Sequence, residues 1–370
     1  MDQTLILGLI ALSIGLSVWA IARDERPVWR FAAPVLPSLK TGSRFEIVFD
    51  YSVASGQAHA PAIVDFSDGL TLLWFEGSAE AQADVEIMAA RLDWQKAKWR
   101  ASPSGAFLTT AGLGQALVPQ QKVVTLGNTI DGGGHDRIFA TIVSVGGWAM
   151  ASVAAITMDA DKPAKAEKLN LSPFLNRSHL VKSPVIAFDD GRSGLPVYFE
   201  MGATYGVLAY LDRSGRVRDT ARLAGPGKPI QPMIVSLDSS KGIAFLRDFD
   251  RSGDLLVSHT TDGGCNWSPS RPAGLPNPSA PVAAVALAMD KVLVVANDDP
   301  QGGDRMSLLE YGPVTRSWRR LRELEPNGAG ARYPMMRVLP DGDIMLTYST
   351  GNKTGLRVVV FSCSWAITEH

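Results

Sequence analysis

The sequence predicts an all-β protein, a six-bladed β-propeller preceded by an apolar N-terminal helix. Two observations carry this prediction. After residue 30 the sequence lacks long helical periodicity, and short apolar runs bounded by Asp-Gly, Ser-Gly or Lys-Gly turns recur along it, as is typical of β-hairpins. The hairpins repeat at a regular spacing, and one of them carries a well-defined turn motif from Thr260 to Trp267.

The hairpin spacing predicts the number of blades. Each unit begins with a first strand that is followed about ten residues later by a second apolar strand. The first strands are predicted to start near Pro61, Arg137, Pro184, Gln231, Pro281 and Tyr333. Apart from the first unit, which has an insertion around Ser102 to Gln120, the starts are roughly 45 to 52 residues apart, as in four-stranded blades. The stretch Phe45 to Val53 should close the ring by pairing near Leu356 to Ser362.

The turn motif supports the same architecture. In Thr260-Thr261-Asp262-Gly263-Gly264-Cys265-Asn266-Trp267, hydroxyl and carboxylate groups can accept hydrogen bonds from turn amides, glycine supplies positive φ, and tryptophan covers the apolar face of the hairpin. Degenerate copies lie at Arg91 to Trp99 and Leu308 to Trp318, where the tryptophan is kept. Because every part of the motif is structural, it predicts a fold and no chemistry.

The composition is that of a globular protein and excludes several classes. Hydrophobic residues make up 46% of the chain and charged residues 20%, so a large core can form. The 36 basic and 37 acidic residues give no electrostatic reason to expect a nucleic-acid partner. Cys265 and Cys363 do not form a disulfide framework, and the five scattered histidines lack zinc-site spacing, so we predict no metal and no cofactor.

The N-terminus carries a targeting or anchoring segment. Leu5 to Ala22 is almost wholly apolar and is ended by Arg23-Asp24-Glu25-Arg26. Its length of about 18 residues is near that needed to span a bilayer, and Ala20-Ile21-Ala22 also offers a small-x-small cleavage site. We therefore predict a signal peptide or membrane anchor over residues 1–22, a linker over 23–43 and a propeller over 44–370. The membrane is an expected partner through this segment.

The orientation across that membrane stays open. Asp2 precedes the apolar run, and Arg23, Arg26 and Arg30 follow it, a bias that by itself would keep the C-terminal side cytoplasmic. The apolar run itself favours export. The prediction is a membrane-anchored or exported protein on the periplasmic or extracellular side, with a buried core helix as the alternative interpretation of the run.

The turn motif and the hairpin period together resemble the Asp-box (BNR) repeat family, which includes the sialidases, from about Ser55 to Phe361. The first unit, HAPAIVDFSDGLTLLWFEGSAEAQADVEIMAAR, is similar to the first blade of that family, and the segments FLRDFD, LPNP, NDD and RYPMMRVLPDGDIMLTY follow. The resemblance implies a sialidase-like propeller whose central cavity acts on an acidic sugar as an exo-glycosidase.

The resemblance also implies site residues. Sialidases hold the substrate carboxylate with three arginines, whose planar donors suit an anion. Arg247 matches the second and Arg305 the third, whereas His59, before Ala60-Pro61, stands in the place of the first. The chain therefore keeps only part of the carboxylate-binding set.

The groups that carry the chemistry are also partly kept. Tyr333 matches the family nucleophile, but Gln231 stands where a glutamate would accept the phenol proton, and an amide cannot be that base. Asp84, with Glu80 close by, is the expected acid/base carboxylate. His59 is a candidate acid/base group or an ordinary hydrogen-bonding residue.

Further polar and aromatic residues near strand ends are expected to contact the sugar, because first strands begin near one mouth of a propeller. These are His179, Lys182, Glu200, Tyr205, Asn277, Asn297 and Tyr348. Each of them could equally belong to the scaffold, since propellers contain many buried polar groups that satisfy strand ends.

The expected function is a sialidase-like glycoside hydrolase acting on an acidic oligosaccharide, polysaccharide or exopolysaccharide. Because His59 and Gln231 replace family residues, a uronic-acid polymer is as reasonable a substrate as a sialoside. Two alternatives stay open: a uronate lyase that uses the same cavity for β-elimination, and a membrane-tethered propeller that binds glycans without catalysis.

Overall fold

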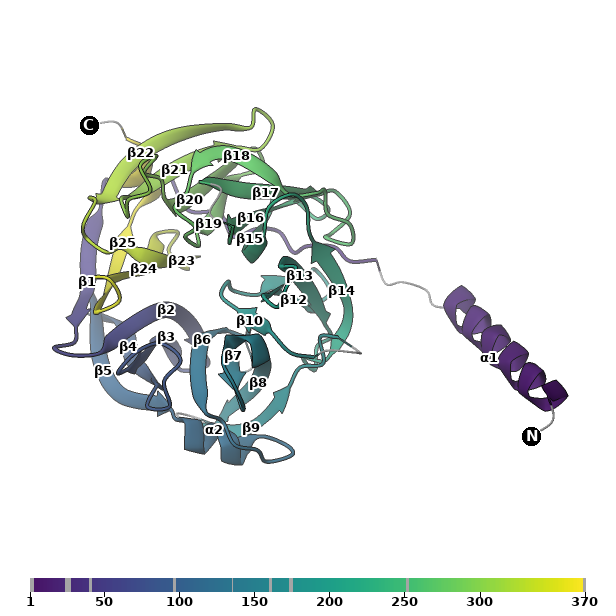
Figure 1. Ribbon diagram of the computed structural model, residues 1–370. Coiled ribbons are helices and arrows are strands. Elements are labelled where there is room, and N and C mark those ends of the chain that lie inside the picture. Colours follow the sequence, from purple (N-terminus) through teal and green to yellow (C-terminus); the bar gives the residue numbers. More distant parts are fainter. Residues whose placement is uncertain are drawn as a thin grey trace.

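Six antiparallel sheets surround a central axis and form a six-bladed β-propeller (Figure 1), which confirms the predicted fold class. The computed structural model describes residues 3–23, 28–39, 42–95, 98–134, 136–159, 162–172, 176–250 and 253–368. Parts of the predicted anchor, linker and propeller therefore lie outside the described ranges, at residues 1–2, 24–27, 40–41 and 369–370. In every blade the first strand lies next to the axis, and each later strand lies farther out.

The first three blades contain thirteen strands. Blade 1 consists of β2 Gln57–Phe66, β3 Gly69–Gly77, β4 Glu86–Gln95 and β5 Lys98–Leu108; blade 2 of β6 Thr125–Asp131, β7 Arg137–Val143, β8 Ser152–Asp159 and β9 Lys162–Lys168; blade 3 of β10 His179–Val181, β11 Ile186–Ala187, β12 Ser193–Phe199, β13 Tyr205–Leu211 and β14 Val217–Leu223. In blade 3 the inner position is shared by β10 and β11, which both pair with β12.

The other three blades contain twelve strands. Blade 4 consists of β15 Pro229–Ser236, β16 Gly242–Asp248, β17 Asp254–Thr260 and β18 Arg271–Pro276; blade 5 of β19 Ala283–Ala288, β20 Lys291–Asn297, β21 Met306–Gly312 and β22 Ser317–Glu325; blade 6 of β23 Arg332–Val338, β24 Ile344–Thr350, β25 Gly355–Phe361 and β1 Phe45–Ser52. The helices are α1 Gln3–Arg23, α2 Thr110–Ala116 and α3 Cys363–Ile367, with a 3-10 turn η1 at Trp148–Met150.

The ring is closed by the two ends of the propeller chain, as predicted. β1 pairs antiparallel with β25, from Phe45 opposite Phe361 to Ser52 opposite Gly355. The N-terminal strand thus becomes the outermost strand of the last blade. Because this pairing joins segments about 300 residues apart, backbone hydrogen bonds hold the strand that leads into blade 1 to the last blade.

One detail of blade 2 differs from the sequence prediction, and one detail of blade 1 refines it. The predicted first strand at Arg137 is the second strand, β7, and the first strand is β6. β6 contains Gly127, Asn128 and Asp131 and a break in register, so its apolar pattern is weak. The predicted insertion around Ser102 to Gln120 is the end of β5 followed by α2, whose first turn is capped by the Thr109 side chain.

Within the predicted linker, residues 28–39 form a strap across one end of the axis. Trp29 and Phe31 are only 3% and 1% exposed. The Trp29 ring lies 4.2 Å from that of Tyr210, and the Phe31 amide donates to the carbonyl of Ser239. Farther along, the Ser38 amide donates to the carbonyl of Gly342, so the strap reaches from blades 3 and 4 to blade 6. We call the end of the axis that it crosses the far mouth.

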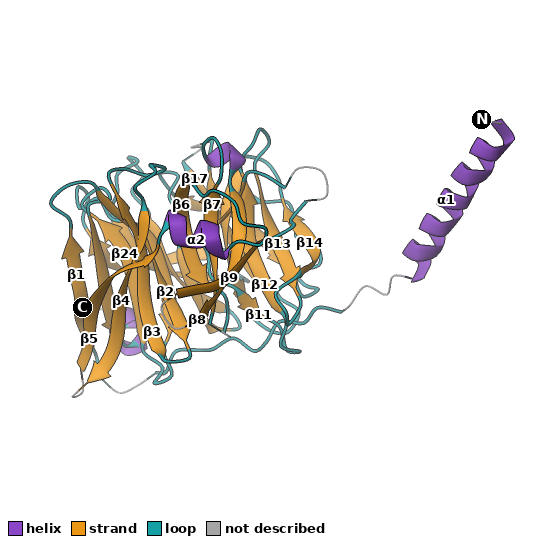
Figure 2. Ribbon diagram, turned by 90° about the horizontal axis from the view of Figure 1, so that it is seen from below, coloured by secondary structure: helices purple, strands orange, loops and turns teal. Residues whose placement is uncertain are grey.

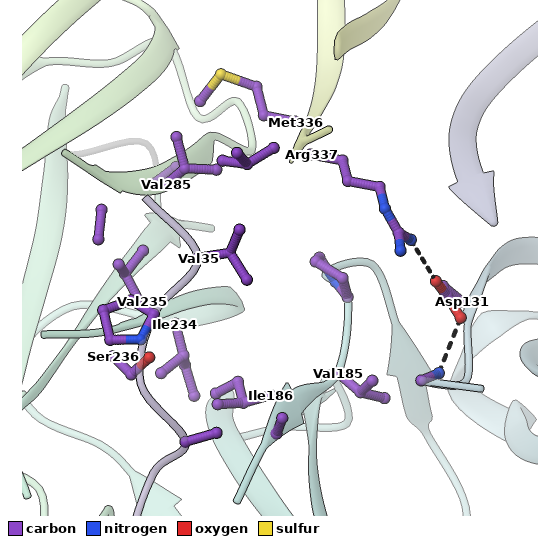
Figure 3. Close-up of a pocket in the computed structure, with 18 of the residues that line it drawn as sticks. Val35, Asp131, Val185, Ile186, Ile234, Val235, Ser236, Val285, Met336 and Arg337 are labelled. Atoms are coloured by element: carbon purple, nitrogen blue, oxygen red, sulfur yellow. Dashed lines mark hydrogen bonds and ion pairs between the residues drawn. The ribbon is translucent and has the colours of Figure 1, made fainter. Parts of the chain in front are cut away.

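The far mouth contains an apolar chamber of about 380 Å³ that the strap partly covers. Figure 3 shows Val35 of the strap pointing into the chamber, whose wall includes Ile186, Ile234 and Val285. The main polar feature is the ion pair between Arg337 and Asp131, 2.8 Å between Nη1 and Oδ2. First strands end at this mouth and begin at the opposite one, which we call the near mouth.

The turn motif lies between β17 and β18, on the far-mouth side and away from the axis. The hydroxyl of Thr260 accepts a hydrogen bond from the Gly264 amide (3.1 Å), and Asp262 accepts one from the Asn266 amide (2.9 Å). Gly263 has φ of +70°, and a Cβ there would lie 1.8 Å from the Trp29 carbonyl oxygen. The turn is therefore structural, as predicted, and it also provides the space into which the strap packs.

Helix α1 lies apart from the ring (Figures 1 and 2). Among the described residues, no helix has the combination of length and apolar character that crossing a membrane requires. Figure 2, viewed across the axis, shows the strands running between two loop-bearing faces of the ring.

Candidate functional site

The near mouth is built on backbone irregularities that recur from blade to blade. In β2, β6, β15 and β23 the pairing register with the second strand shifts by one residue, which marks a β-bulge. The bulge residues Ala60, Gln231 and Tyr333 have φ of +53°, +51° and +57°, and each precedes a proline. Positive φ is uncommon for such residues, and strained backbone tends to collect at functional sites. Here it presents the side chains of Gln231 and Tyr333 to the axis.

These bulges line a cavity of about 260 Å³ at the near mouth. Three parts of the fold form its polar wall: the starts of first strands, the residues at or just beyond the ends of second strands, and the β3–β4 loop. The polar and charged side chains include Glu80, Asn128, Tyr198, Glu200, Gln231, Arg247, Tyr333 and Lys353, and the aromatic ones are Phe75, Trp148 and Phe249. A cavity that combines aromatic surface with a few converging charges is suited to a sugar carrying a charged group.

Gln231 lies at the centre of the polar wall. Its Oε1 accepts a hydrogen bond from Arg247 Nη1 (3.3 Å), and its Nε2 donates to the hydroxyls of Tyr198 (3.2 Å) and Tyr333 (3.4 Å). A guanidinium can only donate, so the amide oxygen must face Arg247 and the amide NH₂ must face both phenols. Gln231 therefore donates to Tyr333 and leaves the phenol proton free for another acceptor.

Arg247 is held in place from two sides. Besides its bond to Gln231, its Nε donates to the Ser279 hydroxyl at 3.0 Å. Ser279 is itself a residue with positive φ, +53°, at the near mouth of blade 5. Neither partner is charged, so the positive charge of the guanidinium stays available to an anion in the cavity.

The two cavity carboxylates have different surroundings. Glu80 forms an ion pair with Lys353, 2.6 Å between Oε2 and Nζ, at the rim. Within the part of the chain that the structure describes, no lysine or arginine lies within ion-pair distance of Glu200. Burial raises the pKa of Glu200, although the Arg247 charge acts in the opposite direction.

His59 lies behind the cavity wall. It is 1% exposed, and its ring packs against those of Tyr333 and Phe75, with centroids 4.3 and 5.4 Å away. Burial lowers its pKa well below the ordinary value, so the imidazole is neutral. Where the family resemblance places an arginine, the cavity is thus backed by a neutral ring that supports Tyr333.

Of the predicted site residues, the structure brings Tyr333, Gln231, Arg247, Glu80 and Glu200 to one cavity. The others lie elsewhere. Lys182 is buried beneath Tyr333, where its Nζ donates to the carbonyls of Pro334 (2.5 Å) and Val282 (3.1 Å). Burial lowers the pKa of Lys182 to about 7.

Asp84 and Arg305 are occupied by local partners outside the cavity lining. Asp84 accepts hydrogen bonds from the backbone amide and the hydroxyl of Ser78, both at 3.0 Å, and these lower its pKa. Arg305 pairs with the buried Asp298, 3.1 Å between Nε and Oδ1. An acid role for Asp84 and a carboxylate-binding role for Arg305 are not favoured by these positions.

The remaining predicted contacts connect strands of the scaffold. The rings of His179 and Tyr205 pack against Phe199, at 5.3 and 5.0 Å between centroids. Asn277 donates to the carbonyl of Asn297, whose own amide donates to the carbonyl of Ala331, and the Tyr348 hydroxyl donates to Glu325. None of these five residues lines the near-mouth cavity as the structure describes it.

Sequence reasoning missed Tyr198, Lys353, Asn128 and Trp148, which line the cavity. One sequence signal could have indicated the bulged strand starts that line the site. The pairs Ala60-Pro61, Gln231-Pro232 and Tyr333-Pro334 repeat at corresponding positions of first strands. The residue before a proline is conformationally restricted, so this repeat marks a special backbone position. Tyr198 follows an ordinary apolar pattern and had no such signal.

The fold is that of a sialidase-like β-propeller. Residues 68–346, well over half of the chain, match the BNR repeat-like domain family, and the chain therefore belongs to that family. This confirms the resemblance stated from the sequence. No curated protein sequence matches the chain.

Solved structures show the same fold at low sequence identity. The Hadza microbial sialidase Hz136 is 14% identical with a TM-score of 0.63, over 86% of this chain and 69% of that one. A protein of unknown function from Dyadobacter fermentans is 13% identical with a TM-score of 0.63, over 87% of this chain and all of that one. Trypanosoma rangeli sialidase is 12% identical with a TM-score of 0.58, over 89% of this chain; the match spans 60% of that longer chain.

Proposed function

We propose that the protein is a carbohydrate-active enzyme of the glycoside hydrolase type that acts on an acidic glycan. The observation that carries this proposal is the near-mouth cavity, in which Arg247 lies with Tyr333 and two carboxylates. A guanidinium with only neutral hydrogen-bond partners is suited to bind a sugar carboxylate, and a phenol and a carboxyl group can take part in cleavage of the glycosidic bond.

The cavity favours a uronate over a sialoside as substrate. Sialidase-like recognition of a carboxylate uses several arginines, whereas here Arg247 is the arginine that lines the described cavity. His59 is neutral and buried, and Arg305 is paired with Asp298. With one guanidinium, the carboxylate is bound by fewer charge-assisted hydrogen bonds, and specificity has to come from the aromatic wall.

Hydrolysis of aryl glycosides tests the proposal. The purified protein is incubated with 4-methylumbelliferyl derivatives of glucuronic acid, galacturonic acid and sialic acid, and with neutral aryl glycosides as controls. We expect release of fluorescent product from an acidic substrate, loss of that release in Tyr333→Phe, and a decrease at low substrate concentration in Arg247→Ala. An absence of release from every acidic glycoside and uronate polymer would overturn the hydrolase proposal.

A second candidate, glycan binding without catalysis, is favoured by one observation. Gln231 donates to Tyr333 and cannot accept its proton, so the phenol lacks the base that a glutamate would provide. Calorimetric binding of uronate oligosaccharides without product release would support this candidate. An increase in ultraviolet absorbance from an unsaturated uronate would instead support the lyase alternative.

Membrane association of the N-terminal segment is also a proposal. It is supported by apolar side chains of α1 that are exposed, including Leu7 at 66% and Val18 at 60%. Protease accessibility in intact cells and fractionation of a variant lacking residues 1–22 test it. Recovery of the intact protein in the soluble fraction would contradict an anchor.

A further inference from the structure

We propose that Glu200 is the proton-transfer group of the near-mouth cavity, acting on the glycosidic oxygen and then on water. This inference rests on the proposed hydrolase function and names the carboxyl group that performs it. It differs from the expectation drawn from the sequence, in which Asp84 or Glu80 served as the acid.

The surroundings of the three carboxylates distinguish them. Asp84 lies outside the cavity lining and is bound by the Ser78 amide and hydroxyl. Glu80 lines the cavity, but its negative charge is matched by Lys353 at 2.6 Å. Glu200 lines the cavity, is partly buried, and has no ion-pair partner among the described residues. A general acid has to retain its proton near neutral pH. Of the three surroundings, only those of Glu200 favour the protonated form.

The position of Glu200 in the fold places it beside the other reacting groups. It directly follows β12, the strand that contributes Tyr198 to the cavity. The titratable groups that line the same cavity and interact with it electrostatically are Tyr198 from the preceding strand, Arg247 from the end of β16 and Glu80 from the β3–β4 loop. Arg247 favours the ionised form of Glu200, whereas burial and Glu80 favour the protonated form, and the net effect is a raised pKa.

These opposing influences suit a group that must both donate and accept a proton. In the first step the Glu200 carboxyl gives its proton to the glycosidic oxygen while the bond from that oxygen to the anomeric carbon breaks, and the leaving alcohol departs. In the second step water adds its hydroxyl to the anomeric carbon, and its proton returns to the Glu200 carboxylate. The sum is glycoside plus water giving free sugar plus alcohol, with Glu200 regenerated.

The test compares Glu200→Gln with Glu80→Gln in the full-length protein. Both variants change one cavity carboxylate to an amide of the same size. Each is assayed on the acidic sugar that the parent protein cleaves, joined either to 4-nitrophenol, a good leaving group, or to methanol, a poor one. We expect Glu200→Gln to lower kcat/KM for the methyl glycoside by about 10²- to 10⁴-fold and for the 4-nitrophenyl glycoside much less, because only the poor leaving group needs a proton.

Two further measurements separate proton transfer from a structural role. The fall in kcat at alkaline pH, which reports loss of the acid proton, should disappear in Glu200→Gln and persist in Glu80→Gln. Added formate should restore part of the activity of Glu200→Gln. Equal losses on both leaving groups, or an unchanged pH profile, would overturn the role of Glu200 while the hydrolase function stands. A parent protein that cleaves neither glycoside would overturn the proposed function and this inference with it.

Discussion

The two mouths of the propeller are formed by the same first strands, yet they differ in backbone and in side chains. At the near mouth the strands carry bulges, and Gln231 and Tyr333 have positive φ and polar side chains. At the far mouth the chamber wall is mainly apolar, and the strap packs on it through Trp29 and Phe31. The comparison indicates that the first strands carry strained backbone at the near mouth, beside a guanidinium with neutral partners, whereas apolar packing dominates the far mouth. Changes at the far mouth should therefore alter stability, and changes at the near mouth should alter activity.

The largest expected effect is on stability, from Trp29→Ala at the far mouth. This change removes a ring that packs on Tyr210 and lies beneath the Arg192 guanidinium, 3.8 Å from the ring centroid. We expect the free energy of unfolding to fall by about 3–5 kcal/mol, as for other buried tryptophans, with kcat unchanged. Chemical denaturation measures it. Val35→Ala, at a residue 70% exposed, is the control and should change stability by less than about 0.5 kcal/mol.

At the near mouth, Arg247→Ala should reduce substrate binding and leave the fold intact. Loss of charge-assisted hydrogen bonds to a carboxylate costs about 1.5–3 kcal/mol, so KM for an acidic glycoside should rise by about 10- to 100-fold. Steady-state kinetics and the thermal midpoint are measured together. Arg305→Ala is the matched control, because Arg305 is paired with Asp298 away from the cavity lining. A larger rise in KM for Arg305→Ala than for Arg247→Ala would contradict the placement of the carboxylate.

A smaller effect is expected where the strap meets the turn motif. In Gly263→Ala the added Cβ would lie 1.8 Å from the Trp29 carbonyl oxygen, so the strap has to shift. Gly274 has almost the same φ, +71° against +70°, and in Gly274→Ala no atom lies within 4 Å of the new Cβ. The difference in unfolding free energy between the two variants isolates the contact, and we expect about 1–3 kcal/mol, as for other overpacked positions. Equal values would show that the strap does not constrain the turn.

The smallest effect concerns Lys182, which lies on the axis between the two mouths. Burial lowers its pKa to about 7 from an ordinary value of 10.5. Between these pH values the unfolded chain binds more protons than the folded one, so Lys182 makes the free energy of unfolding rise with pH by at most about 1.4 kcal/mol per pH unit. Below pH 7 both states are protonated and the contribution is flat. Lys182→Met should lack this part of the slope, measured by denaturation at pH 7, 8 and 9.

The sequence predicted the fold better than the site, for physical reasons. Closure of the ring by β1 and β25 followed from two apolar strands at the ends of the repeat. The first strand of blade 2 was missed because β6 is polar and bulged. The meeting of Tyr333, Gln231 and Arg247 was expected from the family resemblance, since the strand positions that carry them are fixed by the blades.

Side-chain partners were much harder to predict. Arg305 was expected to face the substrate, but it forms an ion pair with Asp298, which lies at the end of the neighbouring strand. Asp84 is bound by Ser78, six residues earlier. Both contacts join residues that are close in the sequence, and each occupies a side chain that would otherwise be available to a substrate. The spacing of residues along the chain does not predict either contact. The orientation of the Gln231 amide likewise depends on Arg247 lying on one side and two phenols on the other.

The strap and the packing beneath Tyr333 have a consequence for turnover. Below the cavity the Lys182 side chain reaches from blade 3 to the carbonyls of Val282 and Pro334, and the void beside it measures about 10 Å³, barely room for one water molecule. The strap crosses the far mouth beyond it. A sugar chain cannot be threaded through such a ring. On the proposed function, the end of the glycan enters by the near mouth and the released sugar leaves the same way. Substrate and product then use the same opening, so the polymer has to leave before the released sugar can. The enzyme should therefore be distributive along a polymer and inhibited by its own product.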